Sequence, residues 1–291
     1  MTGYAATGTA APSREAAVRP FRPLHWPFAV PAVIVTLVVL LPFLWLALLS
    51  FVDQGSLSLV HYQRMLENQS YASILADTVL LSLLVTAIVI VLGIPTTYFI
   101  VRQPPLLSLV LLGCVAIPFW TSLLVRTYAW MVLLQRKGLI NTWLLDLGIV
   151  DRPLRMANSF TGTTIGMVHI MLPFFIFPLF SAMRQIDPDM VKAARSLGAS
   201  RTRAFWSVFL PLSTPGIMAG GLLSFVLCLG FYVTPQLLGG GNVTTISMKI
   251  QQNVTMYAEW GASSALGLVL LVLVLACFLV SQWIVPRRLR S

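Results

Sequence analysis

Long apolar stretches, separated by short polar ones, occupy most of this chain. From residue 27 onward, runs of about 20 apolar residues recur, and a helix of that length is long enough to cross a bilayer. The runs predict six membrane-spanning helices, at residues 27–52, 72–101, 106–124, 160–183, 214–238 and 262–285. The first run is too long for the core of a signal peptide and is followed by no small-residue cleavage site, so we interpret it as a retained span. The predicted fold is an all-α, polytopic membrane protein.

The polar intervals predict how the spans are connected. Residues 102–105 form a tight turn, because two consecutive prolines cannot continue a helix. The third span is expected to be bent or interrupted near Pro118. Apolar positions within residues 139–147 share one helical face, which predicts a short interfacial helix with a tryptophan at headgroup level. Residues 239–261 are expected to form a loop before the last span.

Composition supports a membrane protein and excludes other classes. Hydrophobic residues make up 57% of the 291 residues and charged residues only 10%, which lies outside the range of soluble domains. The net charge of +10 does not indicate nucleic-acid binding, because the basic residues are scattered among short loops and form no motif. Cys114, Cys228 and Cys277 lie singly inside apolar runs, so we interpret them as small core residues, neither disulfides nor metal ligands.

The distribution of lysine and arginine predicts the orientation. With the N-terminus in the cytoplasm, twelve of the 19 basic residues fall on the inner side: Arg14, Arg19, Arg22, Arg102, Arg184, Lys192, Arg195, Arg201, Arg203, Arg287, Arg288 and Arg290. The other seven fall on the outer side: Arg64, Arg126, Arg136, Lys137, Arg152, Arg155 and Lys249. The inner segments are also shorter, so the bias favours both termini inside. The basic tails, residues 1–26, expected to be disordered, and 286–291, are then cytoplasmic.

The same orientation places the polar interval 187–211, DPDMVKAARSLGASRTRAFWSVFLP, in the cytoplasm. Its pattern predicts a helix over 190–197, a break at Gly198, which can take a positive φ, and a second helix over about 200–209. Ala193 and Ala194 present almost no side chain, so the first helix can lie close against a partner protein. The alternative is an ordinary amphipathic loop between two spans. We call this interval the coupling loop.

Six residues of the coupling loop carry a family resemblance. Lys192, Ala193, Ala194, Gly198, Leu210 and Pro211 resemble the EAA loop of the integral membrane subunits of bacterial ABC importers. Further segments are similar to permeases of the spermidine/putrescine class: PFWTSLLVRTYAW (118–130), GLINTWLLDLGIVDRP (138–153), HIMLPFFIFPLF (169–180) and FYVTPQLLGGG (231–241). The resemblance implies a MetI-like permease fold over residues 27–285, in a bacterial inner membrane, with a loop that docks on an ATPase.

The resemblance also implies the partners: a second, related permease that completes a heterodimer, two cytoplasmic ATPase subunits and a periplasmic substrate-binding protein. ATP and Mg²⁺ would be bound by the ATPase subunits, because this chain has no GxxxxGKS or GxxxxGKT phosphate loop. No cofactor and no catalytic site are expected in the chain itself. The implied substrate is a polyamine, and the alternative is an opine, an amino-acid derivative or another small organic solute.

Two residues depart from the family pattern. Lys192 stands where the family usually has a carboxylate aimed at its ATPase, although Asp187 and Asp189 nearby keep some acidic character. Gln236 stands at or beside a position where polyamine permeases have an acidic residue. A polycation crossing apolar surroundings needs carboxylates or aromatic faces in place of water. The departure at Gln236 therefore leaves the substrate open.

Candidate pathway residues lie near the outer membrane boundary. Four are expected at the outer end of the fifth span, where a gate between two permeases would lie: Phe231, Tyr232, Thr234 and Gln236. Two carboxylates lie close to that boundary, Asp77 and Glu259. Tyr232 is equally an interfacial anchor, whereas for the two acids a solvated charge at a helix start is the favoured alternative. His169 is expected to be a packed, hydrogen-bonded side chain.

Small residues at four-residue spacing, Gly216, Gly220 and Ser224, form a stripe along the fifth span and allow a close helix contact. The sequence leaves open whether this stripe packs on the second permease or within the chain's own bundle. A secondary transporter or channel is the alternative of another class, disfavoured by the lack of an inverted repeat and of a row of intramembrane charges. An intramembrane enzyme is disfavoured because no paired carboxylates, HExxH or Ser-Lys arrangement occurs within the spans.

Overall fold

The computed structural model describes residues 26–53 and 55–284, and the predicted tails, apart from Trp26, lie outside the described residues. The chain divides into two units, residues 1–45 and 46–291, and each is described by itself. The first contains most of helix α1 (Trp26–Leu49), whose side chains from Val30 to Trp45 are all exposed. A helix that is apolar on every side and exposed in this way is suited to the hydrocarbon of a bilayer.

The second unit is helical apart from one hairpin, in which β1 (Val52–Asp53) pairs antiparallel with β2 (Ser56–Leu57). Its helices are α2 (Val60–Glu67), α3 (Gln69–Val101), α4 (Pro105–Trp120), α5 (Leu123–Leu133), α6 (Leu139–Asp146), α7 (Phe160–Arg184), α8 (Pro188–Ser196), α9 (Arg201–Ala204), the π-helical turn η1 (Phe205–Phe209), α10 (Leu210–Leu229), α11 (Val233–Leu238), α12 (Ile246–Thr255) and α13 (Trp260–Ile284). Five described helices are long and apolar enough to cross a membrane, and the bent pair α4–α5 makes six. The predicted all-α, polytopic architecture is thereby confirmed, with six spans when the bent pair is counted as one.

The third span is interrupted just after Pro118, as expected, and the helix that follows, α5, meets α4 at 97°. Pro118 lies within the last turn of α4, where its missing N–H removes a helical hydrogen bond. The guanidinium of Arg126 donates to the carbonyls of Pro118 and Thr121, and to the Thr121 hydroxyl at 2.9 Å. A charged donor thus satisfies backbone acceptors that the break leaves open.

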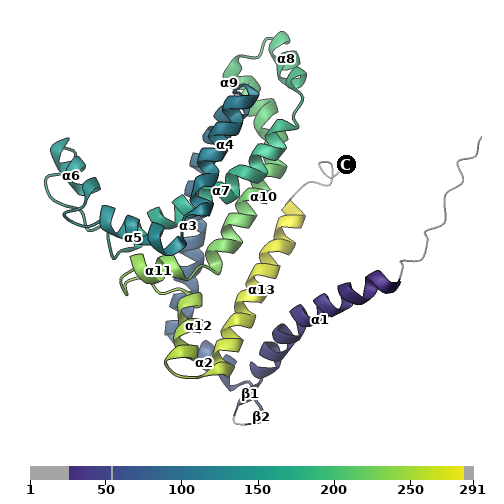
Figure 1. Ribbon diagram of the computed structural model, residues 1–291, viewed down its shortest axis with the longest axis vertical. Helices are drawn as coiled ribbons and strands as arrows, with labels where there is room; N and C mark the ends of the chain where they lie inside the picture. The colour runs from purple at the N-terminus through teal and green to yellow at the C-terminus, as the bar shows by residue number, and fades with distance from the viewer. Residues whose placement is uncertain (1–25, 54, 285–291) are drawn as a thin grey trace, which may run out of the picture. The chain divides into compact units, whose positions relative to one another are not determined.

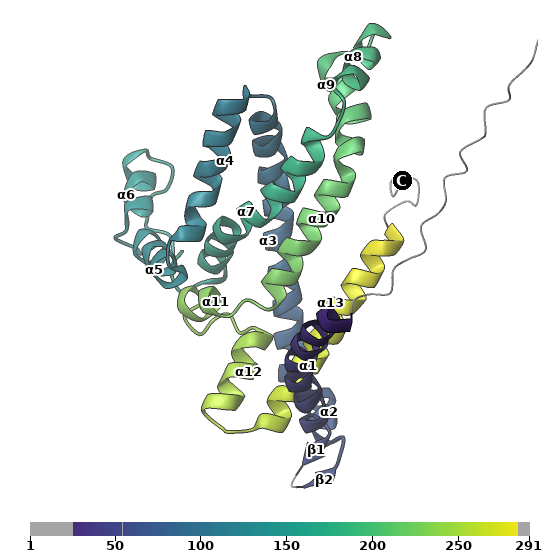
Figure 2. The same ribbon diagram turned by 45° about the vertical axis from the view of Figure 1, so that its right-hand side comes forward.

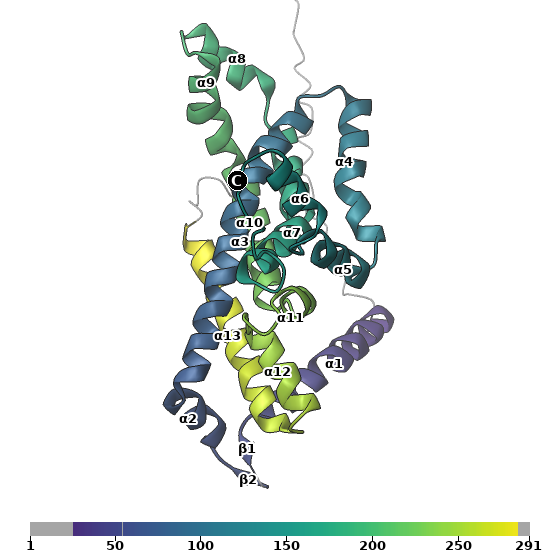
Figure 3. The same cartoon turned by 90° about the vertical axis from the view of Figure 1, so that its left-hand side faces the viewer.

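Helices α3, α7 and α10 form the core of the second unit and lie side by side in Figures 1, 2 and 3. Phe175 of α7 is fully buried at their centre. A Cβ added at Gly93 of α3 would meet the Phe175 ring at 2.3 Å, and one added at Gly220 of α10 would meet the Phe175 carbonyl oxygen at 2.8 Å. The small-residue stripe of the fifth span therefore packs within the chain's own bundle, which decides the alternative left open by the sequence.

The fifth span is shorter than expected. Helix α10 ends at Leu229, and after Gly230 the chain turns into the separate helix α11. The expectation that residues 214–238 form one span is therefore wrong. The residues Phe231, Tyr232, Thr234 and Gln236 belong to a connecting segment at the predicted outer end of α10. The predicted loop of residues 239–261 also contains a helix, α12 (Ile246–Thr255). This helix is amphipathic, and its apolar residues are separated by polar ones, so the sequence shows no apolar run there.

Two smaller expectations have different outcomes. The short helix expected within 139–147 is present as α6, with Trp143 58% exposed, and its position at the membrane interface stays a prediction. The interpretation of all three cysteines as core residues is wrong for Cys114, which is exposed on α4, whereas Cys228 is buried and Cys277 half-buried. Most of α4 faces outward, because within the described residues only its Ser108 is buried. An apolar helix in a membrane needs no protein neighbour to cover it.

Candidate functional site

The coupling loop begins with a helix whose start is fixed by local chemistry. The carboxylate of Asp187 accepts a hydrogen bond from the Asp189 N–H at 2.9 Å, and Pro188 occupies the first helical position, where no N–H is needed. Helix α8 therefore starts two residues before the predicted range of 190–197. The end of α8 is set by Gly198, which has φ +90 and closes the helix as the sequence predicts.

Beyond Gly198 the chain enters a continuous helical rod. The hydroxyl of Ser200 accepts from the Arg203 N–H at 3.2 Å and starts α9, which runs through η1 into α10 without a break. Leu210 and Pro211 are thus the first residues of α10 and not part of a linker. Because proline lacks an N–H and crowds the carbonyl four residues earlier, the wider π turn at 205–209 accommodates Pro211 inside the rod.

Helix α8 presents two different faces. Met190, Ala193 and Leu197 are exposed, with Leu197 90% exposed, and their spacing places them along one side of the helix. We call these three residues the apolar stripe. On the opposite side, Pro188, Val191, Lys192 and Arg195 line a cavity of about 620 Å³ beneath the loop. Ala194 is half-buried between the two sides.

The reversed charge at Lys192 is balanced within the loop. Its Nζ donates to a carboxylate oxygen of Asp189 at 2.7 Å, three residues earlier. That hydrogen bond and the charge of Asp189 raise the pKa of Lys192. Both carboxylates of α8 are therefore engaged, Asp187 as the helix cap and Asp189 in the ion pair, so neither is an unpartnered acid.

At the outer end, the four predicted pathway residues lie on or next to α11 but differ in their surroundings. Thr234 is fully buried, and its hydroxyl lies 3.4 Å from that of Thr127 on α5. Phe231 packs against the central core, Tyr232 is half-buried and Gln236 is exposed. Gln236 is thus the member of this group whose side chain is open to a solute.

Asp77 and Glu259 are both exposed, as the alternative of solvated charges also requires. Asp77 lies in the third turn of α3, beside Thr78, whose hydroxyl accepts from the Ile246 N–H of α12 at 3.0 Å. Glu259 immediately precedes α13. Within the described part of the chain, no hydrogen bond or ion pair joins these two acids to Gln236 or to each other. Their roles, like those of the other candidate residues, stay predictions.

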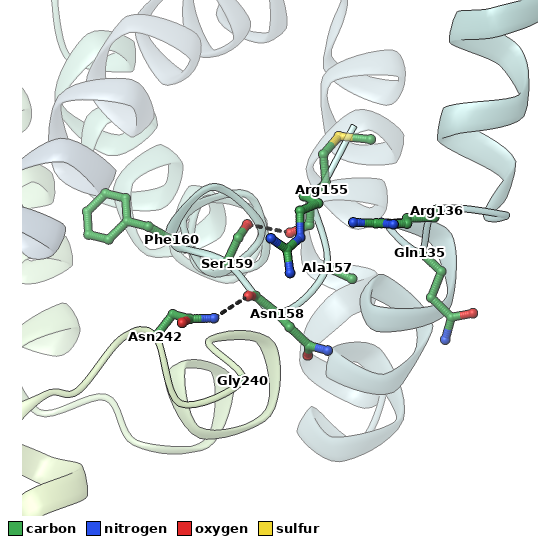
Figure 4. A pocket seen from close by; sticks show the side chains of 10 residues that line it. Gln135, Arg136, Arg155, Ala157, Asn158, Ser159, Phe160, Gly240 and Asn242 are labelled. Carbon is green, nitrogen blue, oxygen red and sulfur yellow. Dashed lines mark hydrogen bonds between the residues drawn. The ribbon is translucent and has the colours of Figure 1, made fainter. Parts of the chain in front are cut away.

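A cavity of about 850 Å³ opens next to α11, and sequence reasoning did not identify it (Figure 4). Arg136 and Arg155 lie on one side of it, and Gly240 and Asn242 on the other. The amide of Asn242 donates to the Asn158 carbonyl at 3.0 Å, and Asn158 has φ +53, a conformation that asparagine tolerates. The clustering of basic residues in 125–159 was the available signal, but the sequence did not place it opposite residue 242.

His169 behaves as expected. The indole N–H of Trp130 on α5 donates to its Nδ1 at 3.1 Å, and the two rings meet at an angle of 65°. This contact joins α5 to α7. It gives the histidine a packing role in the described structure.

Comparison with known proteins identifies the family. Residues 90–290 match the model of the family described as "Binding-protein-dependent transport system inner membrane component". The chain belongs to this family. The permease is therefore a multi-pass component of a bacterial inner membrane, and its resemblance to the permeases of ABC importers is confirmed.

Relatives cover most of the permease. The spermidine/putrescine transport system permease protein PotB of Haemophilus influenzae is 34% identical over 241 residues, 81% of this chain and 84% of its own. PotB of Escherichia coli K12 is 32% identical and covers 88% and 94% of the two chains. PhnU of Salmonella typhimurium LT2, named as a 2-aminoethylphosphonate transport system permease, is 26% identical over 88% and 90%.

The fold is also found in a solved transporter. A chain of the bacterial alginate ABC transporter, crystallised with an alginate pentasaccharide-bound periplasmic protein, matches with a TM-score of 0.75 over 91% of this chain and 95% of that chain. Its sequence identity is 16%, so the likeness shows the fold alone. The predicted MetI-like permease fold is confirmed.

Proposed function

We propose that the chain is one of two related permease subunits in an ATP-driven importer of polyamines of the spermidine/putrescine class. The complete transporter would contain two cytoplasmic ATPase subunits and a periplasmic substrate-binding protein. The substrate class rests on the PotB relatives, which are at least 32% identical over more than 80% of the chain. The permease itself would bind no nucleotide, and ATP with Mg²⁺ would be held by the ATPase subunits.

The observation that carries the coupling role is the exposed apolar stripe of α8 on a loop that leads into a continuous rod. Leu197, at 90% exposure, is a large apolar side chain at the end of a short polar helix. Such a side chain fits a pocket on a partner, because a few well-buried side chains supply most of the binding free energy of a protein interface. We propose that this pocket belongs to an ATPase subunit, on the cytoplasmic side predicted by the arginine distribution.

The rod supplies a path for motion from the ATPase into the membrane. Residues 201–229 form one apolar helical span, and η1 contacts both α8 and α10. Because η1 packs against α8 and continues directly into α10, a displacement of α8 would be passed to the rod through this contact and tilt α10. ATP binding, by closing the ATPase pair, would favour the outward-open arrangement, and hydrolysis would reset it.

A second substrate class is favoured by one specific observation. Arg136 and Arg155 line the outer cavity, and Gln236 provides a dipole where polyamine permeases have an acid. Two guanidinium groups repel a polycation and attract a carboxylate or phosphonate. A zwitterionic solute such as an amino-acid derivative, an opine or an aminophosphonate is thus the alternative, and PhnU offers a relative named for such a compound.

The two substrate classes are distinguished by ligand-stimulated ATP hydrolysis. The complete complex, reconstituted in lipid with its binding protein, is offered spermidine, putrescine or 2-aminoethylphosphonate. We expect spermidine or putrescine to stimulate hydrolysis severalfold above the rate without ligand. Stimulation by the phosphonate alone would assign the second class, and a wild-type response of Arg136→Gln plus Arg155→Gln would remove the outer cavity from the argument. Transport that survives ATP depletion but collapses with the ion gradient would overturn the importer itself.

A further inference from the structure

The cavity beneath the coupling loop carries an unusual concentration of positive charge. Its basic lining residues come from three helices, α7, α8 and α9, and from the turn after α3: Arg102, Arg184, Lys192, Arg195 and Arg201. None of its lining residues is acidic. Within the described part of the chain, Lys192 has the carboxylate of Asp189 as a partner, and the four arginines form no salt bridge. The cavity, of about 620 Å³, therefore suits an anion.

Aromatic side chains fix the position of this charge. The guanidinium of Arg102 lies 4.6 Å from the centre of the Tyr98 ring. Tyr98 in turn meets Phe205 edge-on at 4.8 Å and Phe209 at 5.0 Å between ring centres. Arg102 is thus held at the wall of the cavity by stacking, and its N–H groups remain available to a ligand.

An apolar groove of about 600 Å³ adjoins the basic cavity and shares Tyr98, Arg201 and Phe205 with it. The groove continues along one face of α3, lined by Ile90, Val91, Ile94 and Pro95, and Trp206 borders it with 63% exposure. Eight residues from Tyr98 to Ile90 correspond to about 12 Å along a helix. One leaflet of a bilayer has a hydrocarbon depth of about 15 Å.

We propose that the basic cavity and the groove together bind one anionic phospholipid of the cytoplasmic leaflet. Its phosphate diester would lie among Arg102, Arg184 and Arg201, and an acyl chain would follow α3 toward the bilayer centre. Basic pockets at the cytoplasmic ends of membrane helices are suited to such headgroups, and Trp206 lies where tryptophan meets the headgroup region. The proposal rests on the cytoplasmic placement of the loop and is independent of the transported solute.

An acidic segment of the ATPase is the competing occupant, and the geometry disfavours it. The apolar stripe, which we assign to the ATPase, lies on the side of α8 opposite to Val191, Lys192 and Arg195. A protein segment would also leave the apolar groove along α3 uncovered. A lipid fills both spaces at once, and it would connect the loop to the ends of α3 and α7.

The test is retention of lipid by the complete importer complex. The complex is purified in mild detergent with phosphatidylglycerol or phosphatidylethanolamine, and bound lipid is counted by native mass spectrometry. We expect selective retention of phosphatidylglycerol, reduced about tenfold or more in Arg102→Gln plus Arg184→Gln, since two charges near the headgroup are lost. The matched control, Arg64→Gln plus Arg152→Gln, removes two exposed arginines of the outer segments and should retain lipid as the wild type does.

A second variant tests the groove without changing charge. Ile94→Trp fills the groove, so it should reduce retention of the diacyl lipid. The basic cavity is unchanged in this variant, so soluble glycerophosphate should displace the lipid that remains bound at the same concentration as in the wild type. If the arginine variant misfolds, Ile94→Trp decides the proposal alone. Equal retention of the two lipids, or equal loss in the control, would overturn it. Wild-type lipid retention with weakened ATPase binding in the arginine variant would assign the cavity to an acidic ATPase segment instead.

Discussion

At one end of the bundle, the coupling loop is held by hydrogen bonds between residues two or three positions apart, such as Asp189 to Asp187 and Arg203 to Ser200. At the other end, α11 and α12 are held by hydrogen bonds that reach 84, 107 and 168 positions along the chain. The first end is specified by local signals and the second by tertiary contacts. Because these hydrogen bonds lie within the coupling loop itself, the loop can keep its shape while it moves against a partner.

The core around Phe175 supports both ends, so disturbing it should have the largest effect. We expect Gly220→Ala to lower the free energy of unfolding by about 1–3 kcal/mol, because the new methyl group would lie 2.8 Å from a backbone carbonyl that cannot rotate away. The matched control is the next residue, Gly221→Ala, whose methyl group would meet Ile90 at an ordinary 3.5 Å. Thermal unfolding in detergent measures both, and equal melting temperatures would contradict the close contact.

The local character of the coupling loop is tested at Gly198. Its φ of +90 strains any residue with a Cβ, so Gly198→Ala should cost about 1–2 kcal/mol at this turn. We expect binding-protein-stimulated ATP hydrolysis to fall severalfold while the melting temperature of the bundle changes little. Gly230→Ala at the outer end is the control, because Gly230 has a φ of −88 and open space around it. Similar losses of hydrolysis in both variants would remove the special role of Gly198.

A leucine that is almost completely exposed occurs at both ends, which gives a direct comparison. Leu197→Ala should weaken binding of the ATPase subunit about tenfold, as loss of a central apolar anchor does. Leu66→Ala, at 88% exposure on α2, should leave that binding unchanged. Both can be measured by titrating the purified ATPase subunit onto the permease pair. An unchanged affinity in Leu197→Ala would exclude the apolar stripe as the docking surface.

The smallest effect is expected at Lys192. Its ion pair with Asp189 is exposed, so Lys192→Gln should not change the melting temperature measurably, whereas Asp187→Ala removes a helix cap and should cost α8 about 1 kcal/mol. Because Asp189 raises the pKa of Lys192, any contribution of the pair is present below the ordinary lysine pKa and is lost only as pH rises through the raised value. Melting temperature should therefore not depend on Lys192 between about pH 5 and 9. A pH-dependent change in melting temperature that occurs in the wild type but not in Lys192→Gln between those pH values would contradict this expectation.

The same contrast explains what the sequence could predict. Six apolar spans, the helix of α8 and the turn at Gly198 follow from composition, periodicity and a single backbone requirement. The end of α10 at Leu229 did not follow, because the span is followed directly by further apolar residues: Phe231, Tyr232, Val233, Leu237 and Leu238. Tertiary contacts distinguish these residues from the span: Thr234 is buried beside Thr127, and Leu238 is buried with Leu134 and Met156.

The candidate site divides in the same way. Ala193, Gly198 and their neighbours were identified from spacing, since the loop's function depends on small residues and a turn at fixed positions. The basic cavity under α8 and the outer cavity with Arg136 and Arg155 were not, because each gathers residues from segments far apart in sequence. Charge counts predicted the side of the membrane for each arginine but not which arginines would meet.

The rod from Arg201 to Leu229 has 29 residues, and at Gly220 it contacts α7 through the fully buried Phe175. If that contact acts as a fulcrum, the arm toward the coupling loop measures about 29 Å and the arm toward the outer end about 14 Å. A rigid tilt that moves Arg201 by some distance would then move Leu229 by about half as much, in the opposite direction. A large displacement of the coupling loop at the ATPase would therefore produce a smaller displacement, exerted with greater force, at the outer segment that carries Gln236.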